Sequence, residues 1–244
     1  MTAPLGRRLA AEAVGTGLLV AVVVGSGIQA TELSRDVGVQ LLANSLATVF
    51  GLGVLITVLG PVSGAHFNPA VTLAAWFTGR RKADGLPLRD VAAYVPAQIA
   101  GAIGGAILAD AMFAKPLTEW STHDRSASHL WLGEVVATTG LILLISGLDR
   151  VGDTSLAPVA VASYIGAAYW FTSSTSFANP AVTIGRAFTG TFAGIAPASV
   201  APFIAAQLVG AVLGLGAVIA VYGRPAPAAD EVAVPHGEPE LASS

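Results

Sequence analysis

The string Asn-Pro-Ala-Val-Thr occurs twice in the chain, once within SGAHFNPAVTLA (63–74) and again within TSFANPAVTIGRA (175–187). Asn is a favoured N-cap, and Pro is favoured at the first helical position, where its missing N–H costs nothing. Each string therefore predicts the start of a helix. The apolar stretches that follow, Val71–Thr78 and Val182–Thr189, are too short to cross a bilayer. Each string thus predicts a half-helix that enters a membrane and stops.

The composition of the chain is that of a membrane protein. Hydrophobic residues make up 54% of the 244 residues and charged residues only 11%, against roughly 25% in soluble globular domains. Six apolar runs carry at most one acid each and approach the ~20 residues that cross a bilayer as a helix. These runs are Leu9–Ala30, Val37–Leu59, Val91–Ala109, Leu130–Leu148, Leu156–Phe171 and Val200–Val221. We predict an all-α membrane protein with six transmembrane helices and two re-entrant half-helices.

The two strings belong to a longer internal repeat. Upstream, Glu12–Thr16 (EAVGT) matches Glu134–Thr138 (EVVAT), and downstream a Gln-x-x-Gly-Ala-x-x-Gly pattern begins at Gln98 and again at Gln207. The chain is thus a tandem duplication of three spans, and because three is odd, the second copy has inverted topology, as in many channels and transporters. The paired glycines either let helix backbones approach closely or reflect the general glycine richness of membrane helices, and their matched positions favour packing. They are Gly101 with Gly105 and Gly210 with Gly214.

The repeat divides the chain into five segments. They are a cytoplasmic N-terminus (1–7), a first repeat (8–112) with half-helix 69–78, an extracellular connecting loop (113–128), a second repeat (129–222) with half-helix 180–189, and a disordered cytoplasmic tail (223–244). The positive-inside rule gives the orientation, because eight Lys and Arg residues fall on one side and four on the other. The eight are Arg7, Arg8, Arg80, Arg81, Lys82, Arg89, Arg150 and Arg224, and the four are Arg35, Lys115, Arg125 and Arg186.

Inverted halves bring the two half-helix N-termini together near the middle of the membrane. Each N-terminus carries roughly +0.5 of an elementary charge, so cations and hydrated protons meet a barrier there. The amides of Asn68 and Asn179 can meanwhile donate hydrogen bonds to a neutral solute. The segments Gly64–Phe67 and Thr175–Ala178 present backbone carbonyls as acceptors, since non-helical backbone within a membrane lines a cavity. This chemistry suits water or polyols and excludes ions.

Over residues 8–222 the chain resembles the major intrinsic protein family, the aquaporins and aquaglyceroporins, in its twin Asn-Pro-Ala strings and repeated Glu-x-x-x-Thr. The resemblance implies a right-handed six-helix bundle, a homotetramer with one pore per subunit, and passive conduction by a multi-pass protein of the plasma or inner membrane. It also implies residue roles. The central motifs are Asn68, Pro69, Ala70, Asn179, Pro180 and Ala181, the pore-lining residues are Gly64, Ala65, His66, Phe67, Phe177 and Ala178, and the loop-bracing acids are Glu12 and Glu134. For the two acids, a proton relay is the alternative.

One position departs from the family pattern. Water- and glycerol-conducting members have an Arg three residues after the second Asn, and here that position is Val182. Arg186 lies about 6 Å of helix rise further on, so we interpret it as a residue at the membrane face rather than a replacement. The other expected constriction residues are Thr48 or, in a gapped alignment, Phe50, together with Ala167 and Ser176. Such a constriction is wide and only mildly polar, so it should admit larger neutral solutes.

The stretch 175–195 also resembles a bacterial branch of the family associated with arsenic resistance. We therefore predict a passive channel for water and small neutral solutes, including glycerol-like polyols, arsenous acid and methylated arsenicals. A strict water channel, a coupled transporter and a structural membrane protein on the same fold are the alternatives. The scattered histidines and the lack of Cys argue against an enzyme, a metal site or a cofactor, and nothing in the sequence indicates a nucleic-acid partner.

Overall fold

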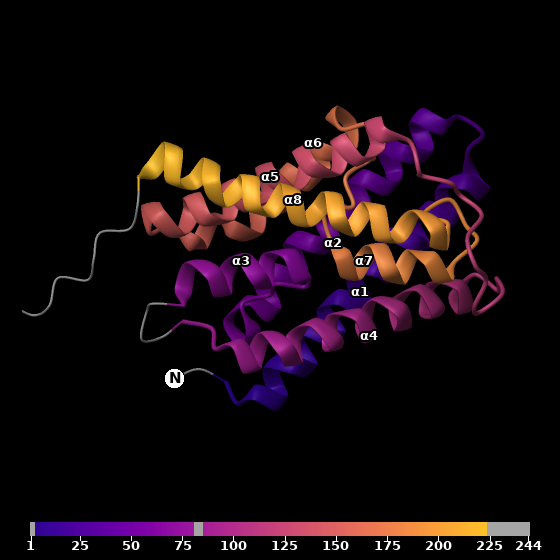
Figure 1. The fold of residues 1–244 in the computed structure, drawn as a ribbon. Helices are drawn as coiled ribbons and strands as arrows, with labels where there is room; N and C mark the ends of the chain where they lie inside the picture. The colour runs from indigo at the N-terminus through magenta and orange to yellow at the C-terminus, as the bar shows by residue number, and fades with distance from the viewer. Residues whose placement is uncertain (1–2, 81–84, 224–244) are drawn as a thin grey trace, which may run out of the picture.

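Helices make up almost all of the computed structural model, which describes residues 3–80 and 85–223 (Figure 1). Their order is α1 (Leu5–Leu33), α2 (Val37–Ser63), α3 (Pro69–Gly79), α4 (Leu88–Met112), α5 (Ser128–Val151), the 3-10 helix η1 (Thr154–Leu156), α6 (Ala157–Phe171), α7 (Pro180–Gly185), the 3-10 helix η2 (Arg186–Phe188) and α8 (Pro197–Tyr222). No strand occurs in the two described ranges, so the predicted all-α class is confirmed. Arg81, Lys82 and the predicted tail from Arg224 onward lie outside the described residues.

Five helices of the described chain, namely α1, α2, α4, α5 and α8, are long and apolar enough to cross a membrane. They coincide with five of the six predicted spans. The sixth prediction, Leu156–Phe171, forms α6, which has 15 residues and is preceded by the single turn η1. Pro158 in its first turn and the extended backbone of Thr172 after its last residue mark these ends.

The half-helices α3 and α7 lie end to end through the middle of the bundle and begin at facing N-termini (Figure 1). The side-chain oxygen of Asn68 accepts a hydrogen bond from the backbone N–H of Ala70 at 2.9 Å, and that of Asn179 accepts one from Ala181 at 3.0 Å. Both asparagines are therefore N-caps. The helix α7 gives way to η2 after six residues, so only the first part of the predicted half-helix 180–189 is α-helical.

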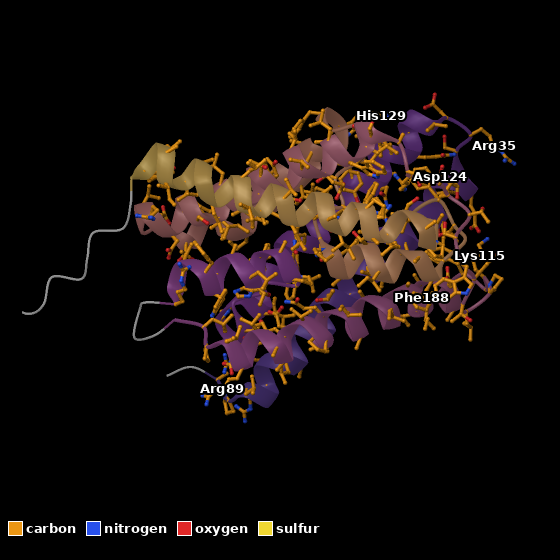
Figure 2. The ribbon with its side chains drawn as sticks, in the orientation of Figure 1. Arg35, Arg89, Lys115, Asp124, His129 and Phe188 are labelled. Atoms are coloured by element: carbon orange, nitrogen blue, oxygen red, sulfur yellow. The ribbon has the colours of Figure 1, made fainter. Side chains whose placement is uncertain are left out.

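Different segments of the chain lie at the two ends of the bundle. The terminal face holds the start of α1 and the end of α8, and the opposite end, the loop face, holds the connection 113–127 (Figure 1). Arg89 lies at the terminal face, whereas Arg35, Lys115 and Asp124 lie at the loop face (Figure 2). Many large hydrophobic side chains are exposed along the helices, as contact with lipid requires.

Matched glycines bring the helices of each repeat into backbone contact. The helix α1 packs along α4, and α5 packs along α8. A Cβ at Gly101 or Gly105 would overlap the backbone of α1, and one at Gly210 or Gly214 would overlap the backbone of α5. The paired glycines therefore have a packing role in both halves.

Replacing Gly101 by Leu should lower the melting temperature of the purified protein, because the new side chain meets the Ala13 carbonyl. Overpacking costs roughly 1–3 kcal/mol, and a chain of this size loses roughly 2–4 °C per kcal/mol. Gly104 is the matched control, because it lies on the same helix and a Cβ there meets nothing within 4 Å. Thermal unfolding in detergent checks the difference. Equal melting temperatures for Gly101→Leu and Gly104→Leu would contradict the close approach of α1 and α4.

Candidate functional site

A cavity of about 1390 Å³ leads from the terminal face into the bundle and ends close to the loop face. The helices α2, α5 and α6 supply an apolar wall that includes Leu52, Ile56, Leu141, Ile145, Val161 and Ile165. The segments before the two caps supply polar backbone. Of the predicted site residues, those that line the cavity are Thr48, Gly64, Ala65, His66, Phe67, Asn68, Ser176, Phe177, Ala178, Asn179 and Val182. The motif residues Pro69, Ala70, Pro180 and Ala181 are buried in the first turns of the half-helices.

Two asparagine side chains cross at the centre of the bundle. Asn68 Nδ2 donates to the carbonyl of Ala178 at 2.7 Å, and Asn179 Nδ2 donates to the carbonyl of Phe67 at 2.8 Å. Each cap is thereby tied to the residue that precedes the other cap. The second N–H of each amide has no protein acceptor among the described residues. Two oriented donors are therefore available to a solute in the cavity.

The segments before the two caps share an unusual backbone conformation. Ala65 and Phe67 have φ of 48° and 49°, and Ser176 and Ala178, at the matching positions, have φ of 51° and 46°. Residues with side chains rarely adopt this left-handed conformation, which costs about 1–3 kcal/mol at each position. In residues 64–67 and 175–178, the backbone carbonyls of Phe67 and Ala178 accept hydrogen bonds from the two asparagines. The other backbone carbonyls of these two segments have no protein donor in the described chain. They can therefore accept hydrogen bonds from a solute.

A buried carboxylate holds the first strained segment in place. Glu12 is 0% exposed, and its Oε1 accepts from Ser63 Oγ at 2.6 Å and from the backbone N–H of His66 at 3.0 Å. Its Oε2 accepts from the backbone N–H of Phe67 at 2.7 Å and from Gln98 Nε2 at 2.7 Å. Four donors thus converge on one carboxylate, which stabilises the turn before the cap.

Glu134 does the same for the second strained segment. Its Oε1 accepts from the backbone N–H of Phe177 at 2.8 Å, and its Oε2 accepts from the backbone N–H of Ala178 at 2.8 Å. Gln207 Nε2 donates both to Oε2 at 2.6 Å and to Thr183 Oγ1 at 2.8 Å, which links the carboxylate to α7. Glu12 and Glu134 do not line the cavity, so neither is placed to pass protons along it.

The loop-face end of the cavity is formed by Thr48, Tyr169, Ser176 and Val182. Thr48 Oγ1 and Tyr169 Oη lie 3.1 Å apart, which joins α2 to α6 by a hydrogen bond. Ser176 Oγ is buried and has no hydrogen-bond partner among the described residues. This end of the cavity therefore combines small side chains with hydroxyl groups.

Two predicted constriction residues are wrong. Phe50 is 69% exposed on the outer side of α2, and Ala167 is exposed on the outer side of α6. Two residues along an α-helix correspond to about 200° of rotation, so Phe50 faces away when Thr48 faces inward. Tyr169 occupies the position expected for Ala167. The inward spacing of Val161, Ile165 and Tyr169, one turn apart, is the signal in the sequence that could have found it.

The interpretation of Arg186 as a residue at the membrane face is also wrong. Its side chain is 5% exposed and lines the cavity. Arg186 begins η2, and its side chain points into the bundle rather than toward the membrane. Its Cζ lies 3.5 Å from the centroid of the Phe177 ring, and its Nε donates to the Ala193 carbonyl. A guanidinium is therefore held at the loop-face end of the cavity.

At the terminal face, a second arginine lies beside the cavity. Arg8 Nη2 donates to Asp90 Oδ2 at 2.7 Å, and Arg8 Cζ lies 5.8 Å from the centroid of the Tyr94 ring. Tyr94 in turn contacts His66 edge-on, with ring centroids 5.7 Å apart. The sequence alone does not predict a pore role for Arg8, Asp90 or Tyr94, because Arg8 and Asp90 are charges near the ends of spans, where charge usually reflects membrane orientation.

The connection 113–127 is fastened to the start of α8 and to the loop before it. The backbone N–H of Arg125 donates to Ser199 Oγ at 2.9 Å, and Arg125 Nε donates to the Gly194 carbonyl at 3.3 Å. Ser199 Oγ also donates to Asp124 Oδ1 at 3.1 Å. Hydrogen bonds with Ser126 and Ser199 lower the pKa of the Asp124 carboxyl, and burial lowers the pKa of the Arg125 guanidinium. An ionised carboxylate thus helps to anchor this loop.

The sequence is similar to those of known proteins over most of its length. The model of the family described as Major intrinsic protein matches residues 2–176. Aquaglyceroporin AqpS of Rhizobium meliloti (strain 1021) is 52% identical over 211 residues, which cover 86% of this chain and 88% of that protein. The propanediol uptake facilitator PduF of Citrobacter freundii is 29% identical over 248 residues, which cover 87% of this chain and 89% of that protein.

The fold is similar to that of a solved structure. The X-ray structure of the aquaglyceroporin from Plasmodium falciparum matches with a TM-score of 0.61 at 23% sequence identity, covering 91% of this chain and 96% of that one. This likeness shows the fold alone. It agrees with the bundle of long helices and two half-helices predicted from the sequence.

Proposed function

The chain belongs to the major intrinsic protein family, and on that premise we propose that it is a passive channel for water and small neutral solutes such as glycerol. The observation that carries the proposal is the pair of crossed asparagines, Asn68 and Asn179, at the facing N-termini of α3 and α7 within the cavity. Two positive helix ends repel cations, and two amide N–H groups replace hydrogen bonds that a neutral solute gives up with its water shell.

A coupled transporter is the competing function on the same fold. Such a protein usually holds its coupling ion or proton on an acid that lies in the solute path near the middle of the membrane. The buried acids Glu12 and Glu134 instead bind the backbone of the two re-entrant segments and lie away from the cavity. Passive conduction is therefore the better-supported function, and the family is one of channels rather than of enzymes.

The distribution of charged and apolar residues supports a location and an orientation of the channel in the membrane. We propose a multi-pass protein of the plasma or inner membrane with the terminal face in the cytoplasm, since Lys and Arg are more numerous there. The repeats 8–112 and 129–222 then form the two inverted halves, joined by an extracellular loop. A homotetramer, as the family resemblance implies, would cover part of the exposed apolar surface. Chemical cross-linking in native membranes checks both the copy number and the accessible face.

The solute class follows from the width of the loop-face end. Ser176 and Val182 are small, and the hydroxyl groups of Thr48 and Tyr169 give that end a polar side. One relative is named an aquaglyceroporin and another a propanediol uptake facilitator, which supports small polyols. Arsenous acid is neutral at pH 7 and resembles a compact polyol in its hydroxyl display, so we include it among the proposed solutes.

The proposal is tested with the purified protein in proteoliposomes. Stopped-flow light scattering measures the permeability to water and to glycerol, and arsenous acid is followed by uptake. We expect all three to pass faster than through protein-free vesicles, without a dependence on a proton or sodium gradient. Permeability equal to that of empty vesicles for all three solutes would reject the channel.

Val182→Arg should reduce glycerol permeability much more than water permeability, because a guanidinium at this lining position narrows the loop-face end. We expect roughly a tenfold loss for glycerol, the effect of a barrier about 1.4 kcal/mol higher. Val182→Ala is the matched control and should keep glycerol flux, since it leaves the opening wide. Stopped-flow assays on the three proteins compare the two solutes. Unchanged or faster glycerol flux in Val182→Arg would contradict a wide opening at this position.

A further inference from the structure

Arg186 brings a full positive charge to the loop-face end of the cavity. Its side chain is 5% exposed, yet it lines the cavity. The Phe177 ring lies 3.5 Å from Arg186 Cζ, and the Ala193 carbonyl accepts from its Nε. A stacked ring and a fixed acceptor hold the guanidinium in one place, which is what a selectivity element requires.

No direct ion pair in the described chain neutralises the charge of Arg186, and the buried Glu134 carboxylate, which attracts both Arg186 and Arg125, lies beyond ion-pair distance. Among the described residues, no carboxylate lies within 4.0 Å of Arg186 or of Arg125, whose Cζ lies 4.9 Å from the centroid of the same Phe177 ring. Two cations therefore share one aromatic ring. Arg125 does not line the cavity, so it adds to the positive potential without contacting a solute.

The terminal nitrogens of Arg186 remain available to a solute. No protein acceptor is bonded to them in the described chain, and they are not among its fully buried unpartnered atoms. Ser176 Oγ lines the same end of the cavity, is buried, and has no hydrogen-bond partner. The guanidinium and the hydroxyl thus offer donors and an acceptor to a hydroxylated solute.

We propose that Arg186 is the residue that excludes cations at the loop-face end of the pore, and that the small side chains of Val182 and Ser176 separately set its width. The inference rests on the proposed channel function and identifies the residue that determines its charge selectivity. Because the charge comes from Arg186 and the width from Val182 and Ser176, different side chains determine charge selectivity and size selectivity. The pore then passes solutes larger than water and still rejects cations of the same size.

Urea and the guanidinium ion provide the matched probes, since they are similar in size and shape and differ in charge. The experiment measures the permeability ratio of urea to guanidinium in proteoliposomes, with water and glycerol flux measured on the same vesicles. The proteins are the wild type, Arg186→Gln, Arg186→Lys, the double variant Val182→Arg with Arg186→Gln, and Arg35→Gln. Arg35 is an exposed arginine at the same face and serves as the control (Figure 2).

We expect the ratio to fall at least about tenfold in Arg186→Gln, because in a protein-like dielectric a unit charge changes the barrier of a cation by about that factor at roughly 10 Å and by more at shorter distances. Water flux should stay within a factor of about two, since the crossed asparagines that bind it are untouched. Arg186→Lys and the double variant should keep the wild-type ratio, because each has a positively charged side chain at the loop-face end of the cavity. Arg35→Gln should match the wild type. If Arg186→Gln is not recovered folded, Arg186→Met keeps the aliphatic stem against Phe177 and takes its place.

An unchanged ratio in the neutral variant would overturn the inference, because the half-helix termini alone would then exclude cations. A wild-type protein that passes guanidinium as fast as urea would overturn it without any variant. Neither result affects the proposed function, which fails only if the wild type conducts none of water, glycerol and arsenous acid.

Discussion

Glu134→Leu should yield a protein that no longer conducts and is recovered poorly as a folded species. The substitution leaves three buried N–H groups without an acceptor, namely the backbone N–H groups of Phe177 and Ala178 and one of the two N–H groups of the Gln207 amide, whose other N–H keeps Thr183 Oγ1. An unsatisfied buried donor costs about 1–3 kcal/mol. The loss falls on a segment in which Ala178 already has φ of 46°, so the hydrogen bond that Asn68 donates to the Ala178 carbonyl must hold this strained backbone without the carboxylate. Yield, melting temperature in detergent and water flux in proteoliposomes measure the effect.

Glu32 is the control for this prediction. It is an acid with an exposed side chain that pairs with Lys115 Nζ at 2.9 Å, and exposed ion pairs contribute about 0–1 kcal/mol. Glu32→Leu should therefore conduct normally. Glu134→Gln keeps one carbonyl oxygen and should lie between the two. A Glu134→Leu protein with the melting temperature and water flux of the wild type would show that the re-entrant segment does not depend on its carboxylate.

The centre of the site could be predicted from the sequence because its signals are local. An Asn followed by Pro and an apolar stretch favours a cap and a helix start, and the repeated string indicates a repeated structure. Glu12 and Glu134 stand at equal places in the two halves, and each binds the backbone just before a cap. Apolar runs also predicted the long helices and the short α6, whose predicted run Leu156–Phe171 differs from the observed helix by one residue.

The loop-face end could not be predicted in the same way, because it depends on the direction of long side chains. Counting residues back from a cap placed Ala167 in the pore, whereas the rotation of α6 turns Tyr169 inward instead. Counting forward placed Arg186 beyond reach, because helix rise alone does not give the direction in which a side chain points at the start of η2. Whether Phe177 would stack on it depends on the turn of the re-entrant segment, which only the folded chain defines.

The two halves therefore diverge with distance from the centre. At the caps, the hydrogen bonds of Asn68 and Asn179 are near copies of each other. Two residues before each cap, the copies differ, with His66 beside Tyr94 in one half and Phe177 beneath a guanidinium in the other. The residues that build the repeated fold are therefore alike in the two halves. The residues that line only one end of the cavity differ between them.

Asn179→Asp should abolish selective water conduction while leaving α7 capped. Asp is as good an N-cap as Asn, so its carboxylate can still accept from the backbone N–H of Ala181. The variant loses the donor to the Phe67 carbonyl and places a negative charge where two positive helix ends meet. We expect water permeability to fall more than about tenfold, a barrier increase of about 1.4 kcal/mol, and proton leak to rise. Stopped-flow scattering and a pH-sensitive dye in the vesicle lumen measure the two changes.

Two further variants distinguish a loss of the solute-binding donor from a loss of stability. Asn179→Ala removes both, so it should lose water conduction and also about 1 kcal/mol of stability, the usual value of an N-cap. Asn44 is a buried asparagine that donates to the Val23 carbonyl at 2.8 Å but does not line the cavity. Asn44→Ala should therefore lower the melting temperature without changing the ratio of water flux to proton leak. If Asn179→Asp conducted water like the wild type, the crossed amides would be structural ties rather than the groups that bind the solute.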